Sequence, residues 1–233
     1  MTCWDDFDDA LRAGVDRIIL YGPPGLGKTR AALGQRITEG GAFRLVCHGG
    51  MTIADVVGMW MPTGAGTLEW RNGPALAARR GNGVVGGRCV ADEIDTASGE
   101  VTSVLMAMFD SAGSDSWMNP YTEEMESPVP GYTVVMTTNL RSPEMLPAAL
   151  ADRFPVKILV DVAHPAAIAA LPKDLQRAAE LLTQANRNPR FSLREIEAFA
   201  LMRETLPVEQ AARLAFGPKA DSATPLRVAA VAK

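Results

Sequence analysis

Short apolar runs alternate, up to about residue 162, with segments whose apolar residues recur at helical spacing. The runs have the length of buried strands and end at turn-forming residues. They predict strands over residues 16–21, 42–49, 88–95, 132–139 and 156–162. The periodic segments between them predict helices over residues 5–14, 28–40, 51–58, 73–81 and 97–112. Strands that alternate with helices are typical of an α/β fold with a doubly wound, mostly parallel sheet.

The pattern changes in two places. Residues 60–70 carry the turn-forming stretch "PTGAGT" between two tryptophans, which predicts a β-hairpin. From residue 162 onward the periodicity is helical, and prolines separate the segments: Pro165, Pro172, Pro189, Pro207 and Pro218. We therefore expect an α/β domain at 1–161 and a helical domain at 162–233, with frayed residues at 219–233.

The stretch "LYGPPGLGKT" lies between a predicted strand and a predicted helix. It matches the phosphate-binding loop pattern through Gly22, Gly25, Gly27, Lys28 and Thr29. Glycines let backbone N–H groups curl around a phosphate, and the following helix directs its positive end at the same anion. Lys28 would reach the β- and γ-phosphates, and Thr29 would hold magnesium. The alternative is an ordinary glycine turn with an exposed lysine. The predicted nucleotide contacts are Gly22, Pro23, Pro24, Gly25, Leu26, Gly27, Lys28, Thr29 and Arg30.

A second candidate site lies in "CVADEID". A strand that ends at Asp92 would place its carboxylate at the carboxyl edge of the sheet, beside the phosphate loop. There Asp92 would bind Mg²⁺ through water, and Glu93 would act as the general base for an attacking water. The alternative interpretation is a strand that ends in a solvated acidic turn.

Composition narrows the class of protein. The net charge of −4 argues against a broad nucleic-acid surface, which needs clustered Lys and Arg. Cys3, Cys47 and Cys89 show no CxxC spacing, so they predict neither a disulfide framework nor a zinc site. The N-terminus is acidic where a signal peptide is basic, and no apolar run approaches the roughly 20 residues of a membrane span. We therefore expect a cytoplasmic protein without a membrane span.

Four segments, "GPPGLGKT", "DEID", "VVMTTNL" and "LPAALADRF", occur in this order along the chain. Together they resemble the AAA+ ATPases, and among these the MoxR branch with its dynein-related module, over about residues 17–204. The resemblance implies a P-loop NTPase fold: a parallel five-stranded sheet sandwiched by helices, plus a small all-helical lid domain. It also implies hydrolysis of ATP with Mg²⁺ by a homo-oligomer, a hexameric ring.

The resemblance gives roles to three more polar residues. Asn139 corresponds to a sensor that aligns the attacking water with Glu93. Arg153, in "LADRF", corresponds to the arginine finger that reaches the γ-phosphate bound by a neighbouring subunit. Arg194, in "FSLREIEAF", corresponds to the second sensor, on the lid. The simpler alternatives are a strand cap for Asn139, a surface ion pair for Arg153 and a solvated helix arginine for Arg194.

Two further segments resemble the same branch. The predicted hairpin at 60–70 precedes a "GP" helix start, and "WMNPYTEEMESPVPGYTVV" is similar to the hairpin before the first sensor. In related rings such insertions line the central pore, which makes Trp60, Met61 and Trp70 candidate substrate contacts. The alternative is that the hairpin packs against the domain body. We expect target choice to depend on a separate partner, which in relatives often carries a von Willebrand factor A domain.

The main hypothesis is an ATP-hydrolysing, ring-forming chaperone that remodels or helps to assemble a partner protein complex. One alternative is a monomeric P-loop kinase, whose activity would not depend on Arg153. Another is a nucleic-acid motor or loader, which would need stimulation by DNA and a basic pore lining. A third is a nucleotide-dependent scaffold with negligible turnover, against which Glu93, Asn139 and Arg153 argue.

Overall fold

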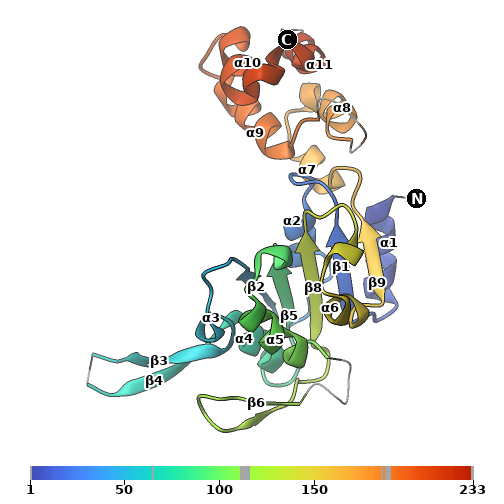
Figure 1. Ribbon diagram of the computed structural model, residues 1–233. Coiled ribbons are helices and arrows are strands. Elements are labelled where there is room, and N and C mark those ends of the chain that lie inside the picture. Colours follow the sequence, from blue (N-terminus) through green and yellow to red (C-terminus); the bar gives the residue numbers. More distant parts are fainter. Residues whose placement is uncertain (1, 65, 111–115, 185, 187–189, 232–233) are drawn as a thin grey trace. The chain divides into compact units, whose positions relative to one another are not determined.

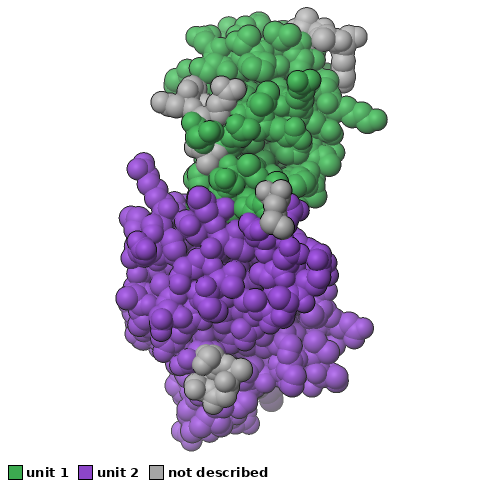
Figure 2. Space-filling model, turned by 90° about the vertical axis from the view of Figure 1, so that its right-hand side faces the viewer, with its two compact units in different colours: residues 1–4, 22–28, 160–233 green, residues 5–21, 29–159 purple. Residues whose placement is uncertain are grey.

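The computed structural model describes residues 2–64, 66–110, 116–184, 186 and 190–231. The chain forms two compact units, which Figure 2 shows in different colours. Unit 1 comprises residues 1–4, 22–28 and 160–233, and unit 2 comprises residues 5–21 and 29–159. The glycine-rich loop therefore clusters with the C-terminal helices.

The centre of unit 2 is a five-stranded parallel sheet in the order β2-β5-β8-β1-β9 (Figure 1). Its strands are β1 (Arg17–Tyr21), β2 (Ala42–Val46), β5 (Arg88–Asp92), β8 (Thr133–Thr138) and β9 (Val156–Leu159). β5 and most of β8 are buried, as expected for parallel strands that are covered on both faces. The predicted fold, a parallel five-stranded sheet with helices and a C-terminal helical region, is confirmed.

Helices surround the sheet and complete the core of unit 2. They are α1 (Cys3–Arg12), α2 (Lys28–Gly34), α3 (Ile53–Val57), α4 (Pro74–Arg80), α5 (Gly99–Met108) and α6 (Ala148–Asp152), with the short 3-10 helices η1 (Ile94–Thr96) and η2 (Pro143–Met145). α4 contacts both β2 and β5. Leu76 of α4, Leu105 of α5 and Phe154, which follows α6, are fully buried in one core cluster. α5 ends at Met108, and residues 111–112 of the predicted helix lie outside the described residues.

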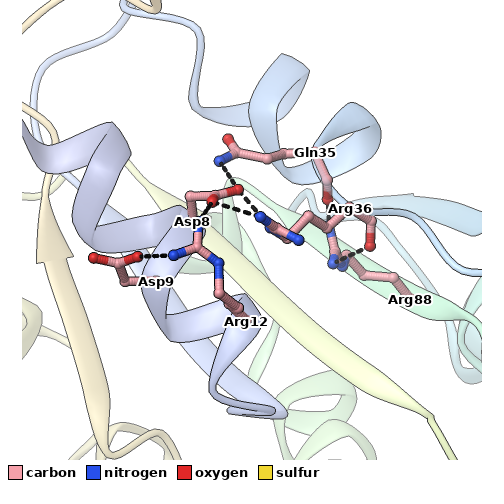
Figure 3. A network of polar contacts seen from close by, with 6 residues as sticks. All are labelled: Asp8, Asp9, Arg12, Gln35, Arg36 and Arg88. Carbon is pink, nitrogen blue, oxygen red and sulfur yellow. Dashed lines mark hydrogen bonds and ion pairs between the residues drawn. The ribbon is translucent and has the colours of Figure 1, made fainter.

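α2 ends at Gly34, well before the end that the sequence predicts for this helix. Arg36 follows with a φ of 48°, in the left-handed region that commonly ends helices. The Arg88 guanidinium donates to the carbonyl oxygens of Gln35 and Arg36, at 2.7 and 3.3 Å, where helical N–H donors would otherwise bind. Asp8 of α1 holds the Arg36 side chain through Nε and Nη2 (Figure 3). Polar contacts between residues distant in sequence therefore set the length of α2.

Unit 2 also carries two antiparallel hairpins. Their strands are β3 (Gly58–Pro62), β4 (Leu68–Asn72), β6 (Trp117–Met118) and β7 (Met125–Glu126). Figure 1 shows the β3–β4 hairpin projecting away from the sheet. Trp60 pairs with Trp70 across this hairpin, with ring centroids 5.6 Å apart, and Trp70 lies 6.0 Å from Tyr121 of the other hairpin. Both predicted hairpins are confirmed, and an aromatic contact joins them.

The C-terminal part of unit 1 is helical. It contains α7 (Pro165–Ala169), α8 (Lys173–Leu182), α9 (Leu193–Met202), α10 (Val208–Phe216), η3 (Gly217–Ala223) and α11 (Thr224–Val231). Phe216 lies at the centre of its core, with ring centroids 5.1 Å from those of both Phe191 and Phe199. Residues 219–231, for which the sequence predicts fraying, form the end of η3 and α11, and Leu226 is fully buried there.

Prolines mark the starts of these helices, as the sequence predicts. Pro165 opens α7, Pro172 and Pro207 directly precede α8 and α10, and Pro218 lies in the first turn of η3. Pro189 lies outside the described residues. Among the helices that the structure describes, none has the length and apolar character needed to cross a membrane.

Candidate nucleotide site

The glycine-rich loop of unit 1 has a backbone that only glycine adopts without strain. Gly22, Gly25 and Gly27 have φ values of 126°, 79° and 99°. A Cβ on Gly25 would lie 2.4 Å from Cβ of Ser192, and one on Gly27 would lie 2.8 Å from Cβ of His164. Positions 25 and 27 therefore require glycine twice over, for the turn and for the close approach of the C-terminal region.

Two basic side chains donate to the carbonyl groups of this loop. Lys28 Nζ donates to the carbonyl oxygens of Gly22 and Pro23, at 2.7 and 2.8 Å. Arg190 Nη2 donates to the carbonyl oxygen of Pro24, at 2.8 Å. Burial lowers the pKa of Arg190, although a nearby carboxylate acts in the opposite direction. Two positive charges are therefore held against the loop, which suits an anionic ligand.

Main-chain groups of the C-terminal region bind the same loop. The N–H of Leu193 donates to the Gly25 carbonyl at 3.0 Å, and the N–H of His164 donates to the Leu26 carbonyl at 2.9 Å. Ser192 forms a capping box at the start of α9, which fixes this helix terminus. Within unit 1, the loop and the start of α9 are thus joined by backbone hydrogen bonds.

In unit 2, Asp92 ends β5 at the carboxyl edge of the sheet and is 3% exposed. Its Oδ1 accepts hydrogen bonds from Thr29 Oγ1 at 2.7 Å and from Thr137 Oγ1 at 2.5 Å. Its Oδ2 accepts from Arg44 Nε at 3.0 Å and from Arg44 Nη2 at 2.5 Å. Burial acts to raise the pKa of Asp92, but the hydrogen bonds from Thr137, Thr29 and Arg44 outweigh it and hold the pKa below its ordinary value.

Thr29 and Asp92, the two predicted metal ligands, form a donor set that Mg²⁺ prefers. Their hydroxyl and carboxylate oxygens lie 2.7 Å apart, and both are hard oxygen ligands. Mg²⁺ is commonly bound by one or two protein ligands and completes its coordination with substrate phosphates and water. These residues therefore fit a magnesium ion that arrives with a nucleotide.

Glu93 and Asn139 are exposed and follow the carboxyl ends of two neighbouring strands, β5 and β8. Glu93 has a φ of 58°, a left-handed conformation that is uncommon for a residue with a side chain. Its N–H donates to Thr137 Oγ1 at 3.2 Å, and the same hydroxyl binds Asp92. The sheet thus places the candidate base and the candidate sensor at one edge, together with Asp92.

The predicted arginines lie in two kinds of setting. Arg153 follows α6, pairs with Asp110 at 3.3 Å and donates to the Ala149 carbonyl at 2.6 Å. Within one chain it is therefore a partner in an ion pair. Arg194 is exposed on α9, and Arg30 is exposed on α2.

Sequence reasoning missed three residues that contact the site: Arg44, Thr137 and Arg190. The sequence itself indicates a contact for Arg44 and Thr137, because a charge in the apolar "AFRLV" and a hydroxyl in a buried strand both require polar partners. The contact of Arg190 with Pro24 joins residues 166 positions apart, and no local pattern indicates it.

A glycine-rich loop that follows one strand of a parallel sheet, and a carboxylate that ends another, define a P-loop nucleotide-binding protein. Residues 17–154 match the family model described as the AAA domain, dynein-related subfamily. The match spans more than half of the chain, so the chain belongs to the AAA domain family.

No curated protein sequence matches the chain. Among solved structures, the crystal structure of a "putative ATPase" from Cytophaga hutchinsonii is similar, with 22% sequence identity and a TM-score of 0.48. The alignment covers 71% of this chain and 48% of that one, so the present chain spans about half the length of that protein.

Proposed function

We propose that this chain binds and hydrolyses ATP as a ring-forming ATPase of the MoxR-like branch. The observation that carries the proposal is the buried carboxylate of Asp92, bonded at 2.7 Å to the hydroxyl of Thr29. Thr29 directly follows the lysine of the phosphate-binding loop. A carboxylate and a loop hydroxyl in this pairing are what a magnesium-dependent P-loop enzyme needs.

Lys28 and the loop backbone would hold the phosphates. Lys28 Nζ is kept beside the loop by the carbonyl oxygens of Gly22 and Pro23, so it would reach the β- and γ-phosphates with little reorganisation. Mg²⁺, when bound by Thr29 and Asp92, neutralises charge on the phosphate oxygens.

Glu93 would accept a proton from the attacking water, and Asn139 would orient that water. The water oxygen forms a bond to the γ-phosphorus while the bond from this phosphorus to the bridging oxygen breaks, and ADP leaves. The strained backbone of Glu93 supports this role, because strain of this kind concentrates at functional sites. Arg194 is proposed to contact the γ-phosphate from the lid.

Arg153 would complete the site of a neighbouring subunit in a homo-oligomeric ring, which we propose is hexameric. Its side chain is 27% exposed and pairs with Asp110 at 3.3 Å. Ion pairs of exposed residues contribute about 0–1 kcal/mol, and we propose that the guanidinium leaves Asp110 and the Ala149 carbonyl to bind a neighbouring γ-phosphate. An arginine supplied in this way stabilises the transition state and can raise the rate about 10³- to 10⁵-fold.

The two hairpins support a protein as the target. Trp60, Met118 and Met125 are 49%, 52% and 60% exposed, and a ring contact between Trp70 and Tyr121 joins the hairpins. Neighbouring Met and aromatic side chains suit an apolar protein surface, whereas the net charge of −4 disfavours nucleic acid. We propose that the ring remodels or helps to assemble a partner complex, through an adaptor that carries a von Willebrand factor A domain.

ATP hydrolysis by the purified protein with Mg²⁺ tests the proposal. Lys28→Ala should abolish nucleotide binding, and Glu93→Gln should bind ATP without turning it over. Arg153→Ala should bind ATP but hydrolyse little, and mixing it with Lys28→Ala subunits should restore activity where an intact Arg153 faces an intact loop. The absence of any heat when ATP and Mg²⁺ are titrated into the wild-type protein would refute ATP binding.

Capture with the ATP-stalled Glu93→Gln protein distinguishes the target classes. A co-purifying protein supports remodelling, whereas co-purifying nucleic acid indicates a motor or loader. Full activity of Arg153→Ala at a dilution where the protein is monomeric would contradict the shared site and favour a kinase-like monomer.

A further inference from the structure

Arg44 is the charged residue of β2, a strand whose other side chains are apolar. Its guanidinium reaches Asp92 at the end of the neighbouring strand and donates to Oδ2 from Nε at 3.0 Å and from Nη2 at 2.5 Å. The side chain of Arg44 is 46% exposed, whereas that of Asp92 is 4% exposed. A half-exposed cation therefore lies on the carboxylate that the proposed function assigns to magnesium.

Both oxygens of Asp92 have hydrogen-bond donors. Thr29 and Thr137 bind Oδ1, and Arg44 binds Oδ2. A buried carboxylate without an opposite charge is strongly unfavourable, so Arg44 neutralises Asp92 much as a metal ion would. A magnesium ion close to this carboxylate, bound directly or through water, would be repelled by the guanidinium at short range.

We propose that Arg44 sets the magnesium affinity of this site, as a positioning residue that acts through Asp92. The guanidinium competes with Mg²⁺ for Oδ2 and weakens metal binding. When the ion arrives with a nucleotide, the half-exposed side chain turns from Oδ2 towards solvent. The inference rests on the proposed binding of magnesium and nucleotide at Thr29 and Asp92.

A purely structural role for Arg44 predicts a different pattern. If the guanidinium only held β2 against β5, Arg44→Gln would lower the melting temperature and leave the affinity for Mg²⁺ unchanged. Competition predicts instead that the same variant melts lower without Mg²⁺ but binds the ion more tightly. The thermal shift on adding Mg²⁺ would then be larger in Arg44→Gln than in the wild type, because the ion stabilises the form that binds it.

The test is a calorimetric titration of Mg²⁺ into protein saturated with ADP. We expect the dissociation constant for Mg²⁺ to fall about tenfold in Arg44→Gln, the lower end of what a charge-assisted hydrogen bond is worth. Arg44→Lys keeps the charge but loses the two-nitrogen geometry, so its value should lie between those of Arg44→Gln and the wild type. Arg12→Gln is the matched control, because it removes the same charge and breaks ion pairs with Asp8 and Asp9 on α1. It should bind Mg²⁺ as the wild type does.

Each outcome decides the inference. An equal or weaker affinity for Mg²⁺ in Arg44→Gln, with unchanged binding in the control, would overturn it. If Arg44→Gln does not fold, Arg44→Lys is tested in its place. A dissociation constant for Mg²⁺ that falls less than about twofold in Arg44→Lys would then count against competition. A wild-type protein that binds no ADP or ATP with Mg²⁺ would instead defeat the proposed function. Normal wild-type binding with an unaltered Arg44→Gln value would defeat only the role of Arg44.

Discussion

Glu93 is a position where stability and catalysis should oppose each other. Its φ of 58° lies in the left-handed region, which costs a residue with a Cβ about 1–2 kcal/mol. Glycine adopts this conformation without strain but loses about 0.5–1 kcal/mol more backbone entropy on folding. We therefore expect Glu93→Gly to raise the free energy of unfolding by about 0.5–1 kcal/mol while it removes the proposed general base.

Calorimetric melting measures this stabilisation, which corresponds to a rise in melting temperature of about 1–4 °C for a chain of this size. Glu123 is the matched control, because it also has a φ of 58° but lies in the turn between β6 and β7. Glu123→Gly should gain similar stability and keep its ATP hydrolysis. Glu93→Gln keeps the strain, so its stability should stay within about 0.5 kcal/mol of the wild type while turnover is lost.

Two results would contradict this reasoning. If Glu93→Gly melts below the wild type while Glu123→Gly melts above it, the backbone at Glu93 is stabilised rather than strained. If Glu93→Gly hydrolyses ATP at the wild-type rate, the side chain is not the base. The second result would leave the strain unexplained by catalysis.

Other substitutions test single contacts. Gly25→Ala should destabilise the fold by at least about 1 kcal/mol and abolish nucleotide binding, because the new Cβ would lie 2.4 Å from Cβ of Ser192. Calorimetric titration measures the binding, and a wild-type affinity would disprove the tight approach. Burial and nearby carboxylates raise the pKa of Cys47 to about 12. At about pH 8 its thiol should therefore react with disulfide reagents only after the protein unfolds, and rapid labelling of the folded protein would contradict this protection. Arg79 is fully buried and donates to two main-chain carbonyls at 2.7 and 2.9 Å. Arg79→Leu should therefore lower the free energy of unfolding, measured with denaturant, by about 2–4 kcal/mol. A loss below about 1 kcal/mol would argue against these hydrogen bonds.

The inner strands of the sheet could be predicted because they are short apolar runs that become buried, as β5 and most of β8 are, whereas the edge strands β2 and β9 are only partly buried. The run "RCVAD" of β5 is buried along its whole length, and such continuous runs differ clearly from the helical segments between them. Lys28 and Thr29 of the loop could also be predicted, because the phosphate-binding loop is defined by residue spacing over a few positions. Information of this kind is local in the sequence.

The remaining features depend on partners distant in the sequence. Helical periodicity runs past Gly34, but Arg36 turns the chain and Arg88, 52 residues later, binds the carbonyl of Arg36 at 3.3 Å. The charge of Arg44 in an apolar strand indicates a polar partner, but only the register of β2 with β5 shows that this partner is Asp92. The register of β2 with β5 decides the contact of Arg44, and the packing of the end of α2 against the start of β5 decides that of Arg88, so neither follows from spacing along the chain.

Thr137 links Asp92, the proposed metal ligand, to the candidate base Glu93. Its hydroxyl donates to Asp92 Oδ1 at 2.5 Å and accepts from the N–H of Glu93 at 3.2 Å, so its single proton is committed to the carboxylate. Thr137 lies in β8, which pairs with β5, and it is 2% exposed, so close packing and its two hydrogen bonds restrict the hydroxyl. We therefore expect a change at Asp92, such as the proposed exchange of the Arg44 guanidinium for a magnesium ion, to reach the strained turn that carries Glu93 through one oxygen atom. Binding of the proposed metal and positioning of the proposed base would then be coupled through one chain of hydrogen bonds.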